Sequence, residues 1–308
     1  GSIVVGDLTG SSIFLTVGDG DFLTGELNAP NGPIGLSANG DLTVPTDLNS
    51  ASVLVRSFQG NVTADGPVDV LGDFEVEAAG SVLLDDVSAA SIIARALGGE
   101  LSTGSLNAPG GAINLEASAS IMFADVVADT LFARSNGGSI MSEAMAVLGG
   151  ALDAEAANDI ALGDVNAAEI RTQSGGGTFV NGVWQAPLID ITTSALDVGP
   201  DALLDAGPNG LIFINSINPF GLFVGEDEEE EFDGFVLNPE VFDRMVADNL
   251  TITALGPFGR DPRGPDSISG ATISIGDLDW SGGEGLSDLT FIAQDEINVL
   301  GAVIGQGG

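Results

Sequence analysis

The side chains of this chain that could do chemistry are almost all carboxylates. Its 308 residues include 45 Asp and Glu, seven Arg and no Lys, His, Cys or Tyr, which gives a formal charge of −38. The usual general bases, thiol nucleophiles, Schiff-base amines and His- or Cys-type metal ligands are therefore missing. Any catalysis must use carboxylates, Arg, Ser or Thr. The same charge repels nucleic acid and anionic lipid, so we expect neither as a partner.

The densest group of acids is the run EDEEEEFD at 226–233. Clustered carboxylate oxygens suit Ca²⁺, and the candidate ligands are Glu226, Asp227, Glu228, Glu229 and Asp233. The run lacks the D-x-[DN]-x-[DN]-G spacing of a calcium loop, so a solvated loop without a bound cofactor is the favoured interpretation. Asp19 and Asp21 in VGDGDFLTG faintly resemble a repeat of the RTX type, but this phrase occurs only once.

Pairs of carboxylates are frequent, as at Asp85/Asp86 and Glu75/Glu77. A glycosidase needs two carboxyl groups roughly 5–10 Å apart. Among 45 acids some pair meets that distance by chance, so a pair alone is poor support for hydrolysis. We therefore expect no enzyme and keep a polysaccharide-active protein that uses carboxylates as an alternative.

Four of the seven arginines recur at long, nearly constant intervals. Arg56, Arg95, Arg134 and Arg171 are spaced by 39, 39 and 37 residues. This spacing predicts one edge of a repeating fold on which Arg alternates with acidic repeats. Charge compensation on an acidic surface is favoured over a stripe that binds a ligand.

Aromatic residues gather around the acidic run. Phe220, Phe223, Phe232 and Phe235 are candidates for contacts with a partner. Packing beneath a surface loop is the favoured alternative for these side chains.

The elements that position these residues are set by a repeat. Small or polar markers recur with a nearly constant period, at Gly20, Gly40, Gly60, Gly80, Gly99, Ala119, Gly138, Asn158 and Gly177. The residue two positions after each marker is always apolar, from Phe22 in the first repeat to Phe179 in the last. Further apolar points make three short segments per repeat, separated by Gly, Asn, Pro and Asp turns.

The strongest internal match aligns ELNAPNGPIGLSA at 26–38 with SLNAPGGAINLEA at 105–117, with eight identities in 13 residues. A period near 20 with three strands and no helical pattern is typical of a parallel β-helix. We therefore predict an all-β fold, a parallel β-helix solenoid with about 19–20 residues per coil.

The two halves of the chain differ in regularity. Residues 1–182 are predicted as regular coils, and residues 183–308 as a continuation with excursions, in one continuous domain of a longer protein. The main excursion, about 215–248, holds the acidic loop and then a short surface helix. Asn238 as N-cap, Pro239 and Glu240 predict its start, and its end is expected near Ala247. A Pro- and Gly-rich loop is expected at 256–267.

These coils resemble the repeat shaft of filamentous haemagglutinin-like exoproteins, the two-partner-secretion adhesins of Gram-negative bacteria. The phrases LTITALG (250–256), ISIGDL (273–278) and LTFIAQDEINVLGAV (289–303) carry the resemblance, together with the absence of Cys. It implies a right-handed coil, export through an outer-membrane secretion partner and a structural or adhesive role outside the outer membrane.

The expected partners are neighbouring segments or copies of the exoprotein and surface glycans or proteins of host or bacterial cells. No apolar stretch is long enough to predict a membrane span. An acidic, Ca²⁺-dependent surface-layer or RTX-like structural protein is kept as a further alternative.

Overall fold

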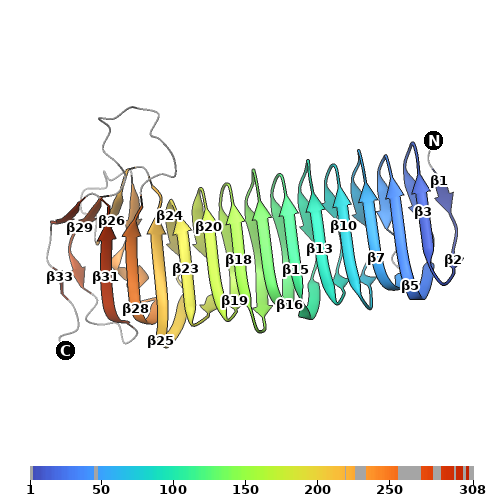
Figure 1. The fold of residues 1–308 in the computed structure, drawn as a ribbon. Coiled ribbons are helices and arrows are strands. Elements are labelled where there is room, and N and C mark those ends of the chain that lie inside the picture. The colour runs from blue at the N-terminus through green and yellow to red at the C-terminus, as the bar shows by residue number, and fades with distance from the viewer. Residues whose placement is uncertain are drawn as a thin grey trace. The chain divides into compact units, whose positions relative to one another are not determined.

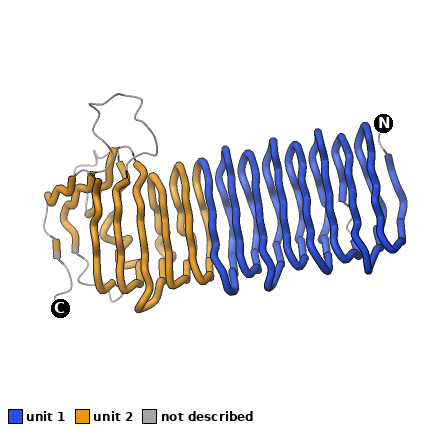
Figure 2. The backbone as a smooth tube through the Cα atoms, viewed as in Figure 1, with its two compact units in different colours: residues 1–157 blue, residues 158–308 orange. Residues whose placement is uncertain are grey.

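The structure is a computed structural model that describes residues 3–44, 48–218, 220–225, 234–255, 272–279, 286–294, 296–300 and 303–304. Its parallel strands stack into a β-solenoid of about 13 turns, or coils, which confirms the predicted fold class. The chain divides into two compact units, unit 1 at residues 1–157 and unit 2 at residues 158–308 (Figure 2).

Unit 1 contains strands β1 to β18 (Figure 1). Their bounds are β1 Ile3–Val5, β2 Leu8–Thr9, β3 Ile13–Val17, β4 Phe22–Thr24, β5 Leu27–Ala38, β6 Leu42–Val44, β7 Leu48–Ser57, β8 Val62–Ala64, β9 Val68–Asp69, β10 Asp73–Ala78, β11 Val82–Leu83, β12 Val87–Ser88, β13 Ser91–Ala96, β14 Leu101–Thr103, β15 Leu106–Ala117, β16 Ile121–Ser135, β17 Ile140–Val147 and β18 Ala151–Ala156. A coil has a first, a second and a third strand, as in β8, β9 and β10. Neighbouring strands of one coil fuse in places, and β16 carries all three.

The core of unit 1 is built from columns of inward side chains. Because side chains alternate across a strand, a first strand of three residues points its two outer residues inward. The predicted first-strand column is buried and in register, and comprises Phe22, Leu42, Val62, Val82, Leu101, Ile121 and Ile140. Burying one such side chain contributes about 1.5–3 kcal/mol, so the repeated pattern holds successive coils together.

Unit 2 continues the same coil type. Its elements are β19 Ile160–Asn166, β20 Glu169–Ser174, β21 Gly177–Val180, β22 Val183–Gln185, β23 Leu188–Thr193, β24 Ala195–Val198, β25 Leu203–Ser216, β26 Leu222–Val224, β27 Phe235–Leu237, α1 Pro239–Phe242, β28 Met245–Ala254, β29 Ile273–Ile275, β30 Leu278–Asp279, β31 Leu286–Ala293, β32 Ile297–Val299 and β33 Val303–Ile304. In-register pairing of β22, β23 and β25 extends past residue 182. Parallel strand pairing therefore continues past residue 182, although β25 carries an insertion.

One predicted core position is wrong by a single residue. Ile160 pairs with Thr178, so the fully buried Thr178 occupies the inward position that the repeat assigns to Phe179. Phe179 points outward and is 37% exposed. The step from Ile160 to Thr178 is one residue shorter than the equivalent step from Ile121 to Ile140. A shift of one residue in a strand exchanges its two faces.

The predicted helix begins where expected and ends earlier than predicted. Asn238 is the N-cap and Pro239 the first helical residue, but α1 ends at Phe242 instead of near Ala247. Met245–Ala254 forms β28 because its alternating pattern buries Met245, Ala247 and the following apolar residues against β25. Among the described residues α1 is the only helix. It is not long and apolar enough to cross a membrane.

The excursion also contains two strands that sequence analysis did not predict. β26 pairs in parallel with both β27 and β29, and β29 pairs with β32. β27 follows β26 in the chain but lies between β24 and β26 in the stack. The stacking order at this point therefore differs from the chain order. The predicted loop at 256–267 lies outside the described residues.

Candidate functional site in unit 2

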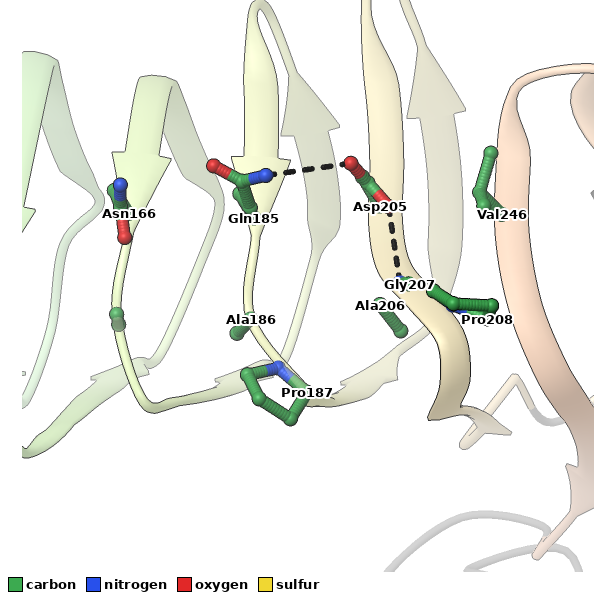
Figure 3. Close-up of a pocket in the computed structure, with 10 residues that line it drawn as sticks. Asn166, Gln185, Ala186, Pro187, Asp205, Ala206, Gly207, Pro208 and Val246 are labelled. Atoms are coloured by element: carbon green, nitrogen blue, oxygen red, sulfur yellow. Dashed lines mark hydrogen bonds between the residues drawn. The ribbon is translucent and has the colours of Figure 1, made fainter.

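A surface pocket of about 400 Å³ lies at the corner between the second and third strands of successive coils in unit 2. Asn166, Gln185 and Asp205 stack in register on neighbouring coils, and their side chains form its polar row (Figure 3). Its apolar lining is contributed by Ala167, Ala186, Pro187, Ala206, Pro208 and Val246. The volume falls within the range of small-molecule sites.

An insertion at the corner of β25 forms one wall of the pocket. The stretch of chain from Leu188 to its partner Leu211 is longer than the equivalent stretch from Ile170 to its partner Ile189. The extra residues include Gly207, whose φ of +76° is a conformation that favours glycine. The Gly207 N–H donates to Asp205 Oδ1 at 2.9 Å, which fixes the carboxylate at the rim.

The chemistry of the pocket suits binding better than hydrolysis. Gln185 Nε2 donates weakly to Asp205 Oδ2 at 3.5 Å, and the exposed Asn166 amide offers a further donor and acceptor. Asp205 is the single carboxylate among the lining residues that the structure describes. Hydrolysis of a glycosidic bond uses a pair of carboxyl groups. The row therefore fits a neutral or cationic ligand that bears hydroxyl groups.

None of the residues that line this pocket was predicted from the sequence as a site. The signal that could have found it is the corner phrase WQAPL at 184–188 followed by LDAGPNGL at 204–211. Both resemble the LNAPNG and LNAPGG phrases at 27–32 and 106–111, which lie at the same corner of coils in unit 1. The row becomes visible only when the coil register is known.

The half-buried Asp190 lies on β23, one coil before Asn215, whose Nδ2 donates to its carboxylate at 2.8 Å. Burial raises the pKa of Asp190, while the Arg171 guanidinium and the Asn215 amide oppose this rise. With the folded pKa above the unfolded value, the folded state holds the proton more tightly. The contribution of Asp190 to stability is full below the unfolded pKa and is lost as pH rises through the folded pKa.

We therefore expect Asp190→Asn to raise the thermal midpoint slightly at pH 7 and to leave it unchanged near pH 3. The asparagine avoids the partly buried charge and keeps an acceptor for Asn215. Thermal unfolding followed by circular dichroism at both pH values measures this. Asp201→Asn removes one exposed negative charge from the same unit and is the control. An equal gain in both variants at pH 7 would show that only the net charge matters.

The predicted arginine edge is confirmed in unit 1. One outward column of the third strands alternates strictly in charge, in the order Arg56, Glu77, Arg95, Glu116, Arg134 and Glu155. Arg95 lies 3.8 Å from the carboxylates of both Glu75 and Glu116, and Arg134 Nε lies 3.0 Å from Glu155. These half-exposed ion pairs support charge compensation.

Arg171 in unit 2 departs from this pattern. It occupies the other outward position of its strand, opposite Asp190, and forms its ion pair with Glu169 of the same strand. In the sequence, Arg171 already differs from the other three, because it follows Arg134 by 37 residues instead of 39.

Many acids at the coil corners bond to the backbone of the next coil. Asp7 Oδ1 accepts from Glu26 N at 3.0 Å, Asp41 Oδ1 from Asn61 N at 2.7 Å, and Asp86 Oδ1 from Ser105 N at 2.7 Å. Asp159 and Asp164 do the same in unit 2. Asp21 also belongs to this ladder, with its Oδ1 accepting from Asp41 N. These carboxylates therefore have a structural role in joining neighbouring coils.

Adjacent acids allow this role to be tested. We expect Asp86→Ala to lower the free energy of unfolding by about 1 kcal/mol because the Ser105 N–H loses its acceptor. Asp85→Ala removes the same charge from the neighbouring exposed residue, for which the described structure gives no such bond. Urea unfolding of both variants measures the difference. Equal stabilities would contradict a structural role for the ladder.

The residues predicted as binding sites are only partly placed. Glu226, Asp227, Glu228, Glu229, Asp233 and Phe232 lie outside the described residues. Within the described part of the chain, no three acidic side chains gather as metal ligands. Phe235 on β27 is buried in the core, Phe223 is half-buried and Phe220 is 56% exposed. Phe235 therefore packs in the core of unit 2.

No family model, curated protein or solved structure matches this chain. The fold and the surface ladders define a class, the parallel β-solenoids with stacked polar side chains. The resemblance to filamentous haemagglutinin-like exoproteins stays a prediction.

Proposed function

We propose that this chain is a non-enzymatic structural and adhesive shaft of a large secreted or surface-anchored bacterial exoprotein. The observation that carries the proposal is the ladder of side-chain bonds that joins many of the coils to the next at the corners. Together with the apolar columns, these bonds resist separation of neighbouring coils. The partners in this proposal are adjoining segments or copies, an outer-membrane secretion partner, and glycans or proteins on cell surfaces.

Single-molecule stretching between tags at the two termini tests the mechanical part. We expect force peaks separated by about 7 nm, the extended length of one coil of 19–20 residues. Asp86→Ala should weaken a peak, whereas Asp85→Ala should not. Extension with the featureless resistance of an unfolded chain would contradict a load-bearing role.

The adhesive part is tested with coated beads under flow over layers of bacterial or epithelial cells. We expect beads coated with the chain to be retained, and beads coated with poly-glutamate of equal charge to wash away. Asn166→Ala/Gln185→Ala removes the amides of the pocket and should reduce retention if the pocket makes the contact. Equal washing of protein and polymer beads would contradict adhesion.

Thermal unfolding in Ca²⁺ and then in chelator separates this proposal from a calcium-dependent scaffold. A self-sufficient shaft should show the same midpoint in both conditions once ionic strength is matched. Mg²⁺ at equal concentration controls for general screening of the 45 acids. A midpoint that collapses only on loss of Ca²⁺ would assign the acidic run to metal binding instead.

A further inference from the structure

The first strands of unit 1 present one outward side chain per coil, and their register stacks these into a single column. The column comprises Val4, Leu23, Thr43, Thr63, Leu83, Ser102, Met122 and Met141. We name it the first-strand stripe. It carries no charge, although the chain as a whole carries −38. At about 4.8 Å per strand, it runs for roughly 34 Å along unit 1.

The large side chains of the first-strand stripe are open to solvent. Val4 is 73% exposed, Leu83 52%, Leu23 46%, Met141 41% and Met122 37%. The third-strand face of the same unit differs, because there Arg and Glu alternate along the coils. A continuous uncharged stripe on so acidic a surface indicates an interaction site.

Acids border the first-strand stripe along both edges. The corner after the strand carries the exposed residues Asp7, Glu26, Asp65, Asp85, Asp86, Asp125 and Glu143. The position before the strand carries Asp21, Asp41 and Glu100, also exposed. The arginines of unit 1 lie on the third strands and contact glutamates there. The border after the strand is therefore strongly negative, and the border before it is acidic on three coils.

We propose that the first-strand stripe docks a cationic amphipathic segment of a different protein, with an apolar row bordered by Lys or Arg. Charge complementarity decides the occupant, since a basic border faces acids on both edges. A second copy would set acidic border against acidic border. The chain itself has no Lys and only seven Arg, so it does not supply such a segment.

A helical partner fits the spacing of the stripe. One helical turn rises about 5.4 Å, close to the distance of about 4.8 Å between coils. A helix along the stripe would therefore place about one apolar side chain against each coil over several turns. This matching does not depend on the shaft proposed above.

The test uses a labelled 18-residue Leu/Lys peptide with one apolar face bordered by Lys. A scrambled peptide of the same composition and charge has no such face. Fluorescence anisotropy at physiological ionic strength measures the binding of each to the full chain. We expect the amphipathic peptide to bind at least about tenfold more tightly.

Variants separate docking from simple attraction of opposite charges. Leu83→Glu and Met122→Glu make the chain more negative, so general electrostatics predicts tighter binding. Docking on the stripe predicts at least about tenfold weaker binding, because a carboxylate enters the apolar contact. Leu71→Glu and Leu148→Glu are matched controls at exposed corners of the same unit. Circular dichroism verifies the fold of each variant.

Two results would overturn the proposal. One is equal binding of the amphipathic and scrambled peptides. The other is binding by the stripe variants that is as tight as binding by the corner controls. Either result would mean that net charge alone explains the binding of the peptide.

Discussion

Replacing Gly111 by Ala will lower the free energy of unfolding by about 3 kcal/mol. Gly111 lies at the corner between the second and third strands, where successive coils approach closely. A Cβ atom at this position would overlap the carbonyl oxygen of Ala90 on the previous coil. Gly32 and Gly72 meet carbonyl oxygens at corresponding corners. The clash is with backbone, so no side-chain rotation relieves it.

Gly18→Ala is the matched control for this experiment. Gly18 also lies in unit 1, and a Cβ there meets nothing within 4 Å. Urea unfolding followed by circular dichroism should leave this variant within about 0.5 kcal/mol of the parent chain. If Gly111→Ala were equally stable, the coils could not approach as closely as the structure shows.

The second large effect is expected at Trp184 in unit 2. We predict that Trp184→Ala will cost about 4 kcal/mol. The side chain is fully buried and stacks in register between Val165 and Leu204. Its indole Nε1 donates to the carbonyl oxygen of Gly163 at 3.1 Å, so the variant loses both packing and a hydrogen bond.

Phe179→Ala provides the control for Trp184 and tests the register of β21. Both residues are large aromatics of the same coil region, but Phe179 points outward. Its removal should cost less than about 1 kcal/mol. Urea unfolding measures both variants. If Phe179→Ala lost much of the free energy of unfolding and Trp184→Ala lost little, the result would contradict the structure. It would support the register expected from the repeat.

Sequence alone was sufficient for the fold class. In a solenoid each coil contacts the coils that precede and follow it in the chain, so every inward position must repeat its apolar character. This is why the columns through Leu42, Leu106 and Ile113 could be recognised without coordinates, and their burial confirms them. The spacing of Arg56, Arg95 and Arg134 likewise indicated a shared edge, because two coils separate each pair.

The prediction from the repeat fails where the number of residues per coil changes. A shortened interval turns Phe179 outward, and the sequence contains no local mark of that slip. The start of α1 follows from Asn238 and Pro239, but its end depends on β25, which recruits Met245 into a strand. The out-of-order stacking of β26 and β27 has no signal in the repeat.

The candidate sites required the tertiary structure because they consist of residues from several coils. Asn166, Gln185 and Asp205 lie on successive coils and resemble ordinary surface positions until the register aligns them. The same holds for the first-strand stripe. The composition determined the net charge and which kinds of catalytic side chain are missing. The periodicity determined which side chains form the core. Only the register between coils, set by side-chain packing and corner hydrogen bonds, decided which surface residues become neighbours.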